Sequence, residues 1–176
     1  MSITELLAAL EAGEHELYAV ATEVNVKQTE TAIGRPLPPS YRAFVTHFSN
    51  GAYLYGIQEV SAVGEGNSQI AAIQSIVLPG RPEPNESVPF REGGEILVAN
   101  LIPFSLDHNG NAWCFLTDSM DQDGEYPVAY LDAAGNKLYG KLASFVDWLR
   151  ILIERQDEVI RTLYDDDVLY DELELG

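Results

Sequence analysis

The stretch that decides the fold is ETAIGRPLPPSYRAFVTHFSNG, residues 30–51. Gly34 ends a helix expected over about Val26–Ile33, because glycine adopts the left-handed conformation of a helix C-cap with little strain. The prolines that follow exclude regular helix until a new one begins near Pro39 or Ser40. Asn50-Gly51 is expected to end this helix. Its apolar stripe at helical spacing consists of Tyr41, Phe44, Val45 and Phe48.

Upstream of this stretch we expect one more short helix, over Ser2–Leu10. Ser2 and Glu5 have the spacing of a capping box, in which the two side chains satisfy each other's backbone N–H groups. The apolar residues of this segment recur at helical spacing and form one face.

Downstream, over 52–131, the pattern changes to short β-rich runs separated by turn residues. Asn109-Gly110 is the sharpest turn signal, because a tight hairpin needs positive φ angles that Asn and Gly tolerate. Pro79–Pro89 holds four prolines and is expected to be a long surface loop. Pro127 demotes the last run to an edge strand or introduces a bulge. The expected strands are Ala52–Ile57, Ile70–Leu78, Ile96–Phe104, Trp113–Thr117 and Tyr126–Leu131.

A long amphipathic helix is expected from about Ser144 to Tyr164, because apolar residues recur at helical spacing while charged residues face away. The segment 165–176 carries six acids and no basic residue. Its few apolar residues could hold a short helix against the body of the protein.

Helices first, then strands, then one long helix is the order of an α+β fold. We expect the N-terminal helices and the long C-terminal helix to pack on a largely antiparallel sheet of about five to six strands. The length of 176 residues fits a single domain, residues 1–176. Within it, residues 1–23 would be an N-terminal helical extension and residues 165–176 an acidic C-terminal segment.

The charge balance narrows the class of partner. The chain has 10 Lys and Arg against 28 Asp and Glu, a net charge of −18. A polyanion repels nucleic acid and anionic membrane surfaces, so neither is expected as a partner. Electrostatic steering favours a basic protein partner. The alternative is that the acidity only keeps the protein in solution.

The cysteine content and the first residues of the chain both bear on the cellular compartment. Cys114 is the only cysteine, so no intramolecular disulfide can form, which suits a reducing compartment. The first residues lack a basic region followed by an apolar run, and no stretch approaches the roughly 18 apolar residues of a membrane span. We therefore predict a cytoplasmic location.

Few residues offer catalysis. Asp107-His108-Asn109 lies close to Cys114 in the sequence, and a Cys–His pair can form a thiolate nucleophile. Cys114, however, falls between Trp113 and Phe115 in an expected strand, where a cysteine is usually a small buried hydrophobe. We predict that the protein is not an enzyme and needs no cofactor.

A calcium loop is the nearest approach to a metal site. Asp118, Asp121 and Asp123 hint at one, but an EF-hand needs an acid at its first position and a Glu at its twelfth. Counting from Ser119 gives Ser and Tyr130 at those positions. Because zinc-ligand spacing of Cys or His is also lacking, no metal is expected.

The decisive stretch belongs to a longer pattern that resembles the SUKH superfamily, which contains the Smi/Knr fungal cell-wall regulators. The N-terminal signature is matched by Glu30-x-x-Ile33-Gly34-x-x-Leu37-Pro38-x-x-Tyr41-Arg42-x-Phe44 with Asn50-Gly51. The superfamily's central strand pair is similar to Ile102-Pro103-Phe104 with Asp107, Gly110, Trp113, Phe115 and Asp118. Its later strand and closing helix are similar to Tyr126-Pro127-Val128 and Ser144-Phe145-x-x-Trp148-Leu149.

The resemblance covers about residues 24–155 and departs from the pattern at Leu116, where the family often has an acid. We interpret most of the matching residues as structural: Glu30, Gly34, Leu37, Pro38, Tyr41, Phe44, Asn50, Gly51, Gly110 and Trp113.

The resemblance also implies a function. Bacterial members act mainly as immunity proteins that bind and neutralise a cognate toxin, often a nuclease, whereas the fungal members are regulatory interaction proteins. A basic toxin surface would fit a partner of net charge −18. The resemblance therefore implies an immunity protein, with a regulatory or scaffolding module as the alternative.

Two acidic clusters with neighbouring tyrosines are the candidate binding face, because aromatic side chains beside acids make good anchors. The first consists of Asp118, Asp121, Asp123, Glu125 and Tyr126, and the second of Tyr164, Asp165, Asp166, Asp167 and Tyr170. The alternative is that both clusters are solvated surface and that the tyrosines cover the core. The sequence does not predict the oligomeric state.

Overall fold

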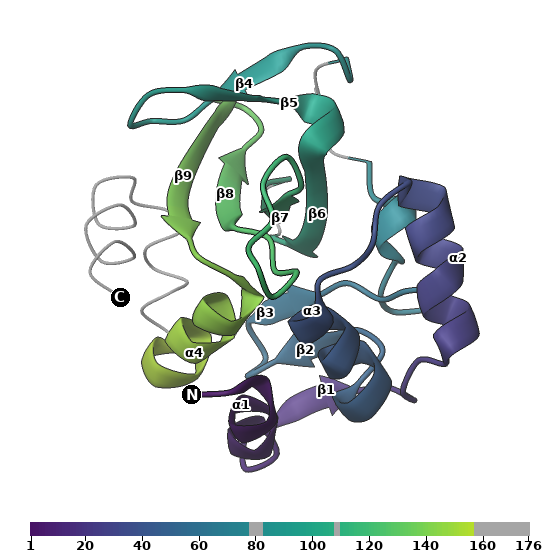
Figure 1. Ribbon diagram of the computed structural model, residues 1–176. Helices are drawn as coiled ribbons and strands as arrows, with labels where there is room; N and C mark the ends of the chain where they lie inside the picture. Colours follow the sequence, from purple (N-terminus) through teal and green to yellow (C-terminus); the bar gives the residue numbers. More distant parts are fainter. Residues whose placement is uncertain (78–82, 108–109, 157–176) are drawn as a thin grey trace.

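The computed structural model describes residues 1–77, 83–107 and 110–156, and its helices pack on one side of a layer of antiparallel strands (Figure 1). The α-helices in these ranges are α1 (Ile3–Leu10), α2 (Glu23–Ile33), α3 (Pro39–Ala43) and α4 (Phe145–Arg155). A π-helical turn, Phe44–Phe48, continues α3 directly.

Two of these helices begin with a capping box. Ser2 and Glu5 form the expected one at the start of α1. Thr22 and Asn25 form a second one at the start of α2, so that this helix begins three residues before the predicted Val26. Both boxes satisfy N–H groups that the first turn of a helix leaves without partners.

The strands form three antiparallel sheets rather than the single sheet of five to six strands that was expected. The first sheet contains β1 (His15–Leu17), β2 (Ala52–Leu54) and β3 (Gln58–Val60), in that order. The second is a hairpin of β4 (Ser87–Pro89) and β5 (Glu95–Leu97). The third contains β6 (Leu101–Leu106), β7 (Ala112–Leu116), β8 (Val128–Asp132) and β9 (Lys137–Leu142), in that order.

The first and third sheets meet edge to edge at β3 and β6. The Ser61 N–H donates to the Phe104 carbonyl oxygen at 2.8 Å. Ser105 lies at the register shift of β6, and its hydroxyl accepts from the Gln58 side chain and donates to the Glu59 carbonyl oxygen. These contacts join the two sheets across the bulge.

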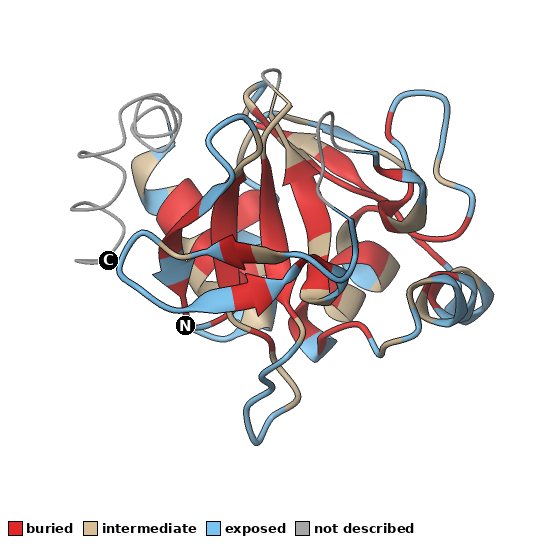
Figure 2. Ribbon diagram, turned by 90° about the horizontal axis from the view of Figure 1, so that it is seen from above, coloured by how far each residue is buried: buried red, intermediate tan, exposed pale blue. Residues whose placement is uncertain are grey.

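The strands of the third sheet divide their side chains between two hydrophobic clusters, as the period of two in a strand requires. Trp113, Phe115, Val128 and Tyr130 point to the helix side and belong to the larger cluster, which all four helices cover. Their sequence neighbours point to the opposite side, where the β4–β5 hairpin covers a smaller cluster. Buried residues therefore run along both faces of these strands (Figure 2). The smaller cluster consists of Ile76, Val88, Ile96, Val98, Leu101, Ala112, Cys114, Leu116, Ala129, Leu131 and Leu138.

Aromatic rings fill the larger cluster. Phe104 and Phe115 stack with their ring centroids 4.3 Å apart, and Phe145 stacks on Trp148 at 5.6 Å. Trp113 and Trp148 lie 6.5 Å apart, which brings β7 into contact with α4. These ring contacts dock α4 on the third sheet.

Several strand predictions were wrong in their extent. The described part of the expected strand Ile70–Leu78 contains an isolated bridge between Ala72 and Ala62 and a 3₁₀ turn, Ile73–Ser75, but no strand. A second 3₁₀ turn, Val98–Asn100, divides the expected strand Ile96–Phe104 into β5 and β6. The last residues of the Pro79–Pro89 loop form β4, whereas β1, β3 and β9 were not predicted. The three residues of β1 and of β3 are too few to show an alternating pattern.

The closing helix and the strand that follows Pro127 also differ from expectation. Arg155 is the last residue of α4, and Gln156 has a positive φ of 34° that ends it, whereas the expected remainder of the helix lies outside the described residues. Pro127 precedes β8, which is an inner strand and not an edge, although its pairing with β9 does contain a register shift. Asn109 of the predicted Asn-Gly turn also lies outside the described residues.

Candidate partner-binding surface

The first acidic cluster lies in the loop between β7 and β8, here called the acidic loop, Asp118–Glu125. Asp118, Asp121 and Asp123 are exposed. Met120 lies among them and is 57% exposed. Sequence reasoning missed this methionine, although an apolar residue within an acidic loop is a signal for an exposed contact.

Asp121 organises the acidic loop from within. One of its carboxylate oxygens accepts hydrogen bonds from the backbone N–H of Asp123 at 2.8 Å and of Glu125 at 3.0 Å. The Asp121 N–H in turn donates to the Glu125 carbonyl oxygen at 2.9 Å. Asp121 therefore stabilises the loop conformation, while Asp118 and Asp123 present their charge to solvent.

Glu125 ties the acidic loop to helix α3. Its carboxylate accepts from both the backbone N–H of Ser40 at 2.8 Å and the hydroxyl of Ser40 at 2.7 Å. The N-cap residue of α3 is Pro38, whose side chain makes no capping hydrogen bond, so Glu125 takes that role. Burial raises the pKa of Glu125, and the hydrogen bonds from Ser40 oppose that rise.

Tyr126 is not the exposed anchor that its place beside the acids indicated. Only 4% of the residue is exposed, and its hydroxyl donates to the Pro36 carbonyl oxygen at 2.8 Å. Burial raises the pKa of Tyr126. This tyrosine covers the core, which is the alternative that the sequence left open for the tyrosines beside the acids.

The second cluster lies outside the described residues, and the structure does not place any of its members relative to the first. It comprises Tyr164, Asp165, Asp166, Asp167 and Tyr170. Its role in binding stays a prediction.

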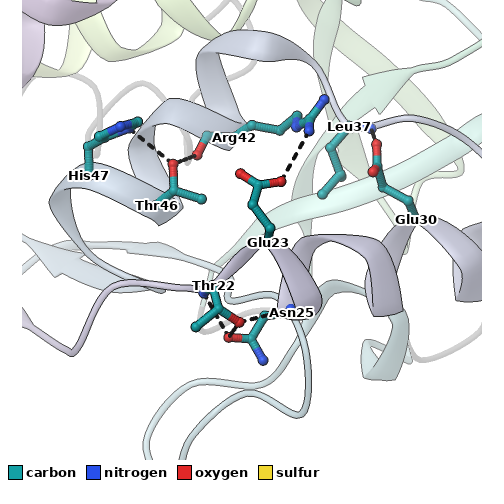
Figure 3. A network of polar contacts seen from close by, with 8 residues as sticks. All are labelled: Thr22, Glu23, Asn25, Glu30, Leu37, Arg42, Thr46 and His47. Carbon is teal, nitrogen blue, oxygen red and sulfur yellow. Dashed lines mark hydrogen bonds and ion pairs between the residues drawn. The ribbon is translucent and has the colours of Figure 1, made fainter.

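The motif residues hold α2 and α3 together (Figure 3). Gly34 ends α2 in the left-handed conformation, with φ of 72°, as its position predicted. The Glu30 carboxylate accepts from the Leu37 N–H at 2.7 Å, which bridges the connection between the helices. Glu23 and Arg42 form an ion pair at 3.5 Å across the same connection. Glu30 and Gly34 therefore shape the connection between α2 and α3.

The remaining motif residues pack or position the start of the first sheet. Tyr41 is fully buried and its hydroxyl donates to the Ser61 carbonyl oxygen at 2.6 Å, so burial raises its pKa strongly. The Asn50 side chain accepts from the Val63 N–H and donates to the Val63 carbonyl oxygen, at 2.9 and 3.2 Å. The core side chains of the motif, Leu37, Phe44 and Trp113, are buried, and Gly51 and Gly110 have positive φ angles.

The candidate nucleophile is buried. Cys114 is a buried thiol with 0% exposure, and it belongs to the smaller hydrophobic cluster. Its expected partner His108 lies outside the described residues. Within 1–77, 83–107 and 110–156, no group of three or more His, Cys, Asp or Glu residues is arranged to hold a metal ion. In the same part of the chain, no helix has the length and apolar character needed to span a membrane.

Comparison with known proteins gives one positive result. The model of the SMI1 / KNR4 family (SUKH-1) matches residues 20–151, which is most of the chain. The match begins after β1 and ends within α4. No curated protein matches the chain.

Proposed function

The chain belongs to the SMI1 / KNR4 family (SUKH-1), and from this membership we propose that it works by binding another protein and not by catalysis. The proposed partner is a cognate bacterial toxin with a basic surface, such as a nuclease domain. The chain would be the immunity protein that neutralises this toxin by direct binding. A regulatory or scaffolding module is the alternative that the same family accommodates.

One observation supports the immunity role most: the acidic loop is held in one conformation before any partner arrives. Asp121 and Glu125 make the hydrogen bonds that order the loop, which leaves Asp118, Met120 and Asp123 at its surface. A preordered loop loses little conformational freedom on binding. Its charges would accelerate encounter with a basic surface, and Met120 would supply an adaptable apolar contact.

Neutralisation would follow from occupation of the basic surface. A nuclease binds phosphates through lysine and arginine side chains, so an acidic protein that covers them removes the electrostatic basis of substrate binding. Reacting groups on the immunity protein are not needed for this. The high net charge of −18 contributes to the rate of association more than to its final strength.

The test is capture of partners from the native lysate with tagged protein at low salt, release at high salt, and identification by mass spectrometry. We expect a single basic toxin domain. Expression of that domain in a test host should stop growth, and coexpression of the chain should restore it. A variant with Asp118→Asn and Asp123→Asn should restore growth less well than the wild type.

Two results would contradict the proposal. A captured toxin domain that stays toxic when the chain is coexpressed excludes neutralisation. Capture of housekeeping or envelope-synthesis proteins alone favours the regulatory module.

A further inference from the structure

The outer strand β1 leaves one edge of the first sheet open. In the order β1-β2-β3, β1 pairs with β2 on one side, and within the described residues no strand pairs with it on the other. Glu16 and Leu17 are exposed. The strand precedes residues 20–151, so this edge lies outside the region that matches the family.

The direction of the open edge follows from one hydrogen bond. The Tyr18 N–H donates to the Ser49 hydroxyl at 2.8 Å, and Ser49 lies on the β2 side. Because backbone groups alternate sides along an antiparallel strand, the N–H and C=O groups of Leu17 and His15 point the other way. They form a short row of donors and acceptors to which another extended chain can pair.

The solvent face beside this edge is acidic and aromatic. Glu16 lies opposite Tyr53, which lies opposite Glu59, so that two carboxylates flank one ring across three strands. Tyr18 lies near the same carboxylates, since partial burial and then the charges of Glu16 and Glu59 raise its pKa. This combination of acids and rings was expected at Tyr126 but is found here.

Apolar side chains are exposed on the other face of this edge, to which Leu17 points, and along the chain toward α2. Leu17 is 46% exposed and Val20, three residues later, is 49% exposed. An added strand needs such contacts, because main-chain hydrogen bonds give affinity while side chains on alternate positions give specificity.

From these observations we propose that β1 is a docking strand for an extended, basic segment of the protein partner, which adds to the first sheet next to His15–Leu17. Lysine or arginine at alternate positions of that segment would lie beside Glu16, and apolar residues between them would contact Leu17. The identity of the partner as a toxin rests on the proposed function, whereas the chemistry of the segment rests on the edge itself.

A second copy of this chain is a poorer occupant. Pairing of β1 with β1 of another copy would place Glu14 and Glu16 of both chains along one short ladder. Like charges at neighbouring cross-strand positions destabilise a sheet. A basic segment removes this repulsion and pairs with the same carboxylates.

The experiment uses the full chain, labelled with ¹⁵N, and a capped peptide of about eight alternating lysine and valine residues, long enough for one strand. Amide shifts should concentrate at residues 14–20. Leu17→Pro removes an N–H that points away from β2, so the sheet should remain while peptide affinity falls about tenfold. Leu17→Val keeps the N–H and is the matched control.

Glu16→Lys should also weaken the peptide about tenfold without touching the backbone, and it decides the question if Leu17→Pro fails to fold. Three results would each overturn the docking strand. The first is that the peptide shifts amides of the acidic loop instead, and the second is that the peptide does not bind at all. The third is that a folded Leu17→Pro variant and the separate Glu16→Lys variant both bind the peptide with unchanged affinity.

Failure of the edge and failure of the toxin role give different results. If the peptide binds at residues 14–20 and no toxin is captured from the lysate, the docking strand is supported and the toxin role is rejected. If a toxin is captured but its complex gives no added hydrogen-exchange protection at residues 14–18, the toxin role is supported and the docking strand is rejected.

Discussion

Glu125 caps helix α3 through Ser40, a residue 85 positions earlier in the chain. The two carboxylate oxygens accept from the Ser40 N–H and the Ser40 hydroxyl, at 2.8 and 2.7 Å. A single side chain therefore satisfies the first turn of a helix and fixes the end of the acidic loop. The geometry of the candidate surface and the stability of the core are coupled at this point.

Replacing Glu125 with Ala should lower the free energy of unfolding by about 1–2 kcal/mol, the usual loss for an N-cap. Urea unfolding measures this loss. The replacement should also increase amide exchange throughout the acidic loop, because its tie to α3 is gone. Ser40→Ala removes only the hydroxyl donor and is the milder control. Equal stability of Glu125→Ala and wild type would show that the cap contributes nothing.

The stability difference between wild type and Glu125→Gln should depend on pH. Burial holds the pKa of Glu125 above its usual value, so the folded state keeps this proton to higher pH than the unfolded state does. The stability from the neutral carboxyl is fully present below the unfolded pKa, about 4.3, and is lost as pH rises through the folded pKa. Unfolding free energies at several pH values between about 3 and 7 test this. We expect the wild type to lose stability relative to Glu125→Gln as pH rises through this range. A gain of wild-type stability relative to Glu125→Gln would instead mean that folding lowers the pKa of Glu125.

Removing charge from the acidic loop should slow association with a basic partner. Asp118→Asn with Asp123→Asn should lower the association rate by up to about tenfold at low salt, and should weaken its salt dependence. Stopped-flow or surface-based kinetics measure both quantities. Glu86→Gln with Glu95→Gln, at exposed acids on the β4–β5 hairpin, removes the same charge elsewhere and is the matched control. The same change at 165–167 tests the C-terminal cluster, and unchanged rates would exclude that placement.

Two motif glycines should differ in their tolerance of alanine. Gly34 has a φ of 72° with open space around it, so alanine should cost about 1 kcal/mol of backbone strain. Gly51 has a φ of 78°, and an added Cβ would lie 3.0 Å from the Ile70 side chain, so contact strain adds to backbone strain. Thermal unfolding should give a clearly lower Tm for Gly51→Ala than for Gly34→Ala. The reverse order would mean that Ile70 moves freely.

The Cys114 thiol should not react with a thiol reagent in the folded protein. It is buried in the smaller cluster, where the reagent has no access to the sulfur atom. A chromogenic disulfide reagent should label it only after denaturant is added. Fast labelling under native conditions would reopen a role for this cysteine as a nucleophile.

The sequence predicted the helical frame well, because its signals are local. The stop at Gly34, the start of α3 at Pro39 and the capping box at Ser2 each depend on a few neighbouring residues. The resemblance to the SUKH superfamily also predicted the family correctly. The strands were harder, because β1 and β3 have three residues each and owe their pairing to β2 and not to a pattern of their own.

The candidate surface was predicted only in part. The exposure of the acids in the acidic loop could be predicted from their charge. The cap that Glu125 provides for α3 could not, because it joins Glu125 to Ser40, which is far away in the sequence. The burial of Tyr126 depends on a hydrogen bond to Pro36, again a long-range contact. Rings were expected beside acids, and the half-buried Tyr53 and Tyr18 lie beside Glu16 and Glu59 on the face that the first sheet turns to solvent.

The two tryptophans of the chain, Trp113 and Trp148, make its intrinsic fluorescence sensitive to one of the two hydrophobic clusters. Both are buried within the larger cluster, so their fluorescence reports on the contact between β7 and α4. The smaller cluster under the β4–β5 hairpin contains neither indole. Melting followed by tryptophan emission would therefore record the helix-covered face alone, and a hairpin that opens first would pass without a signal.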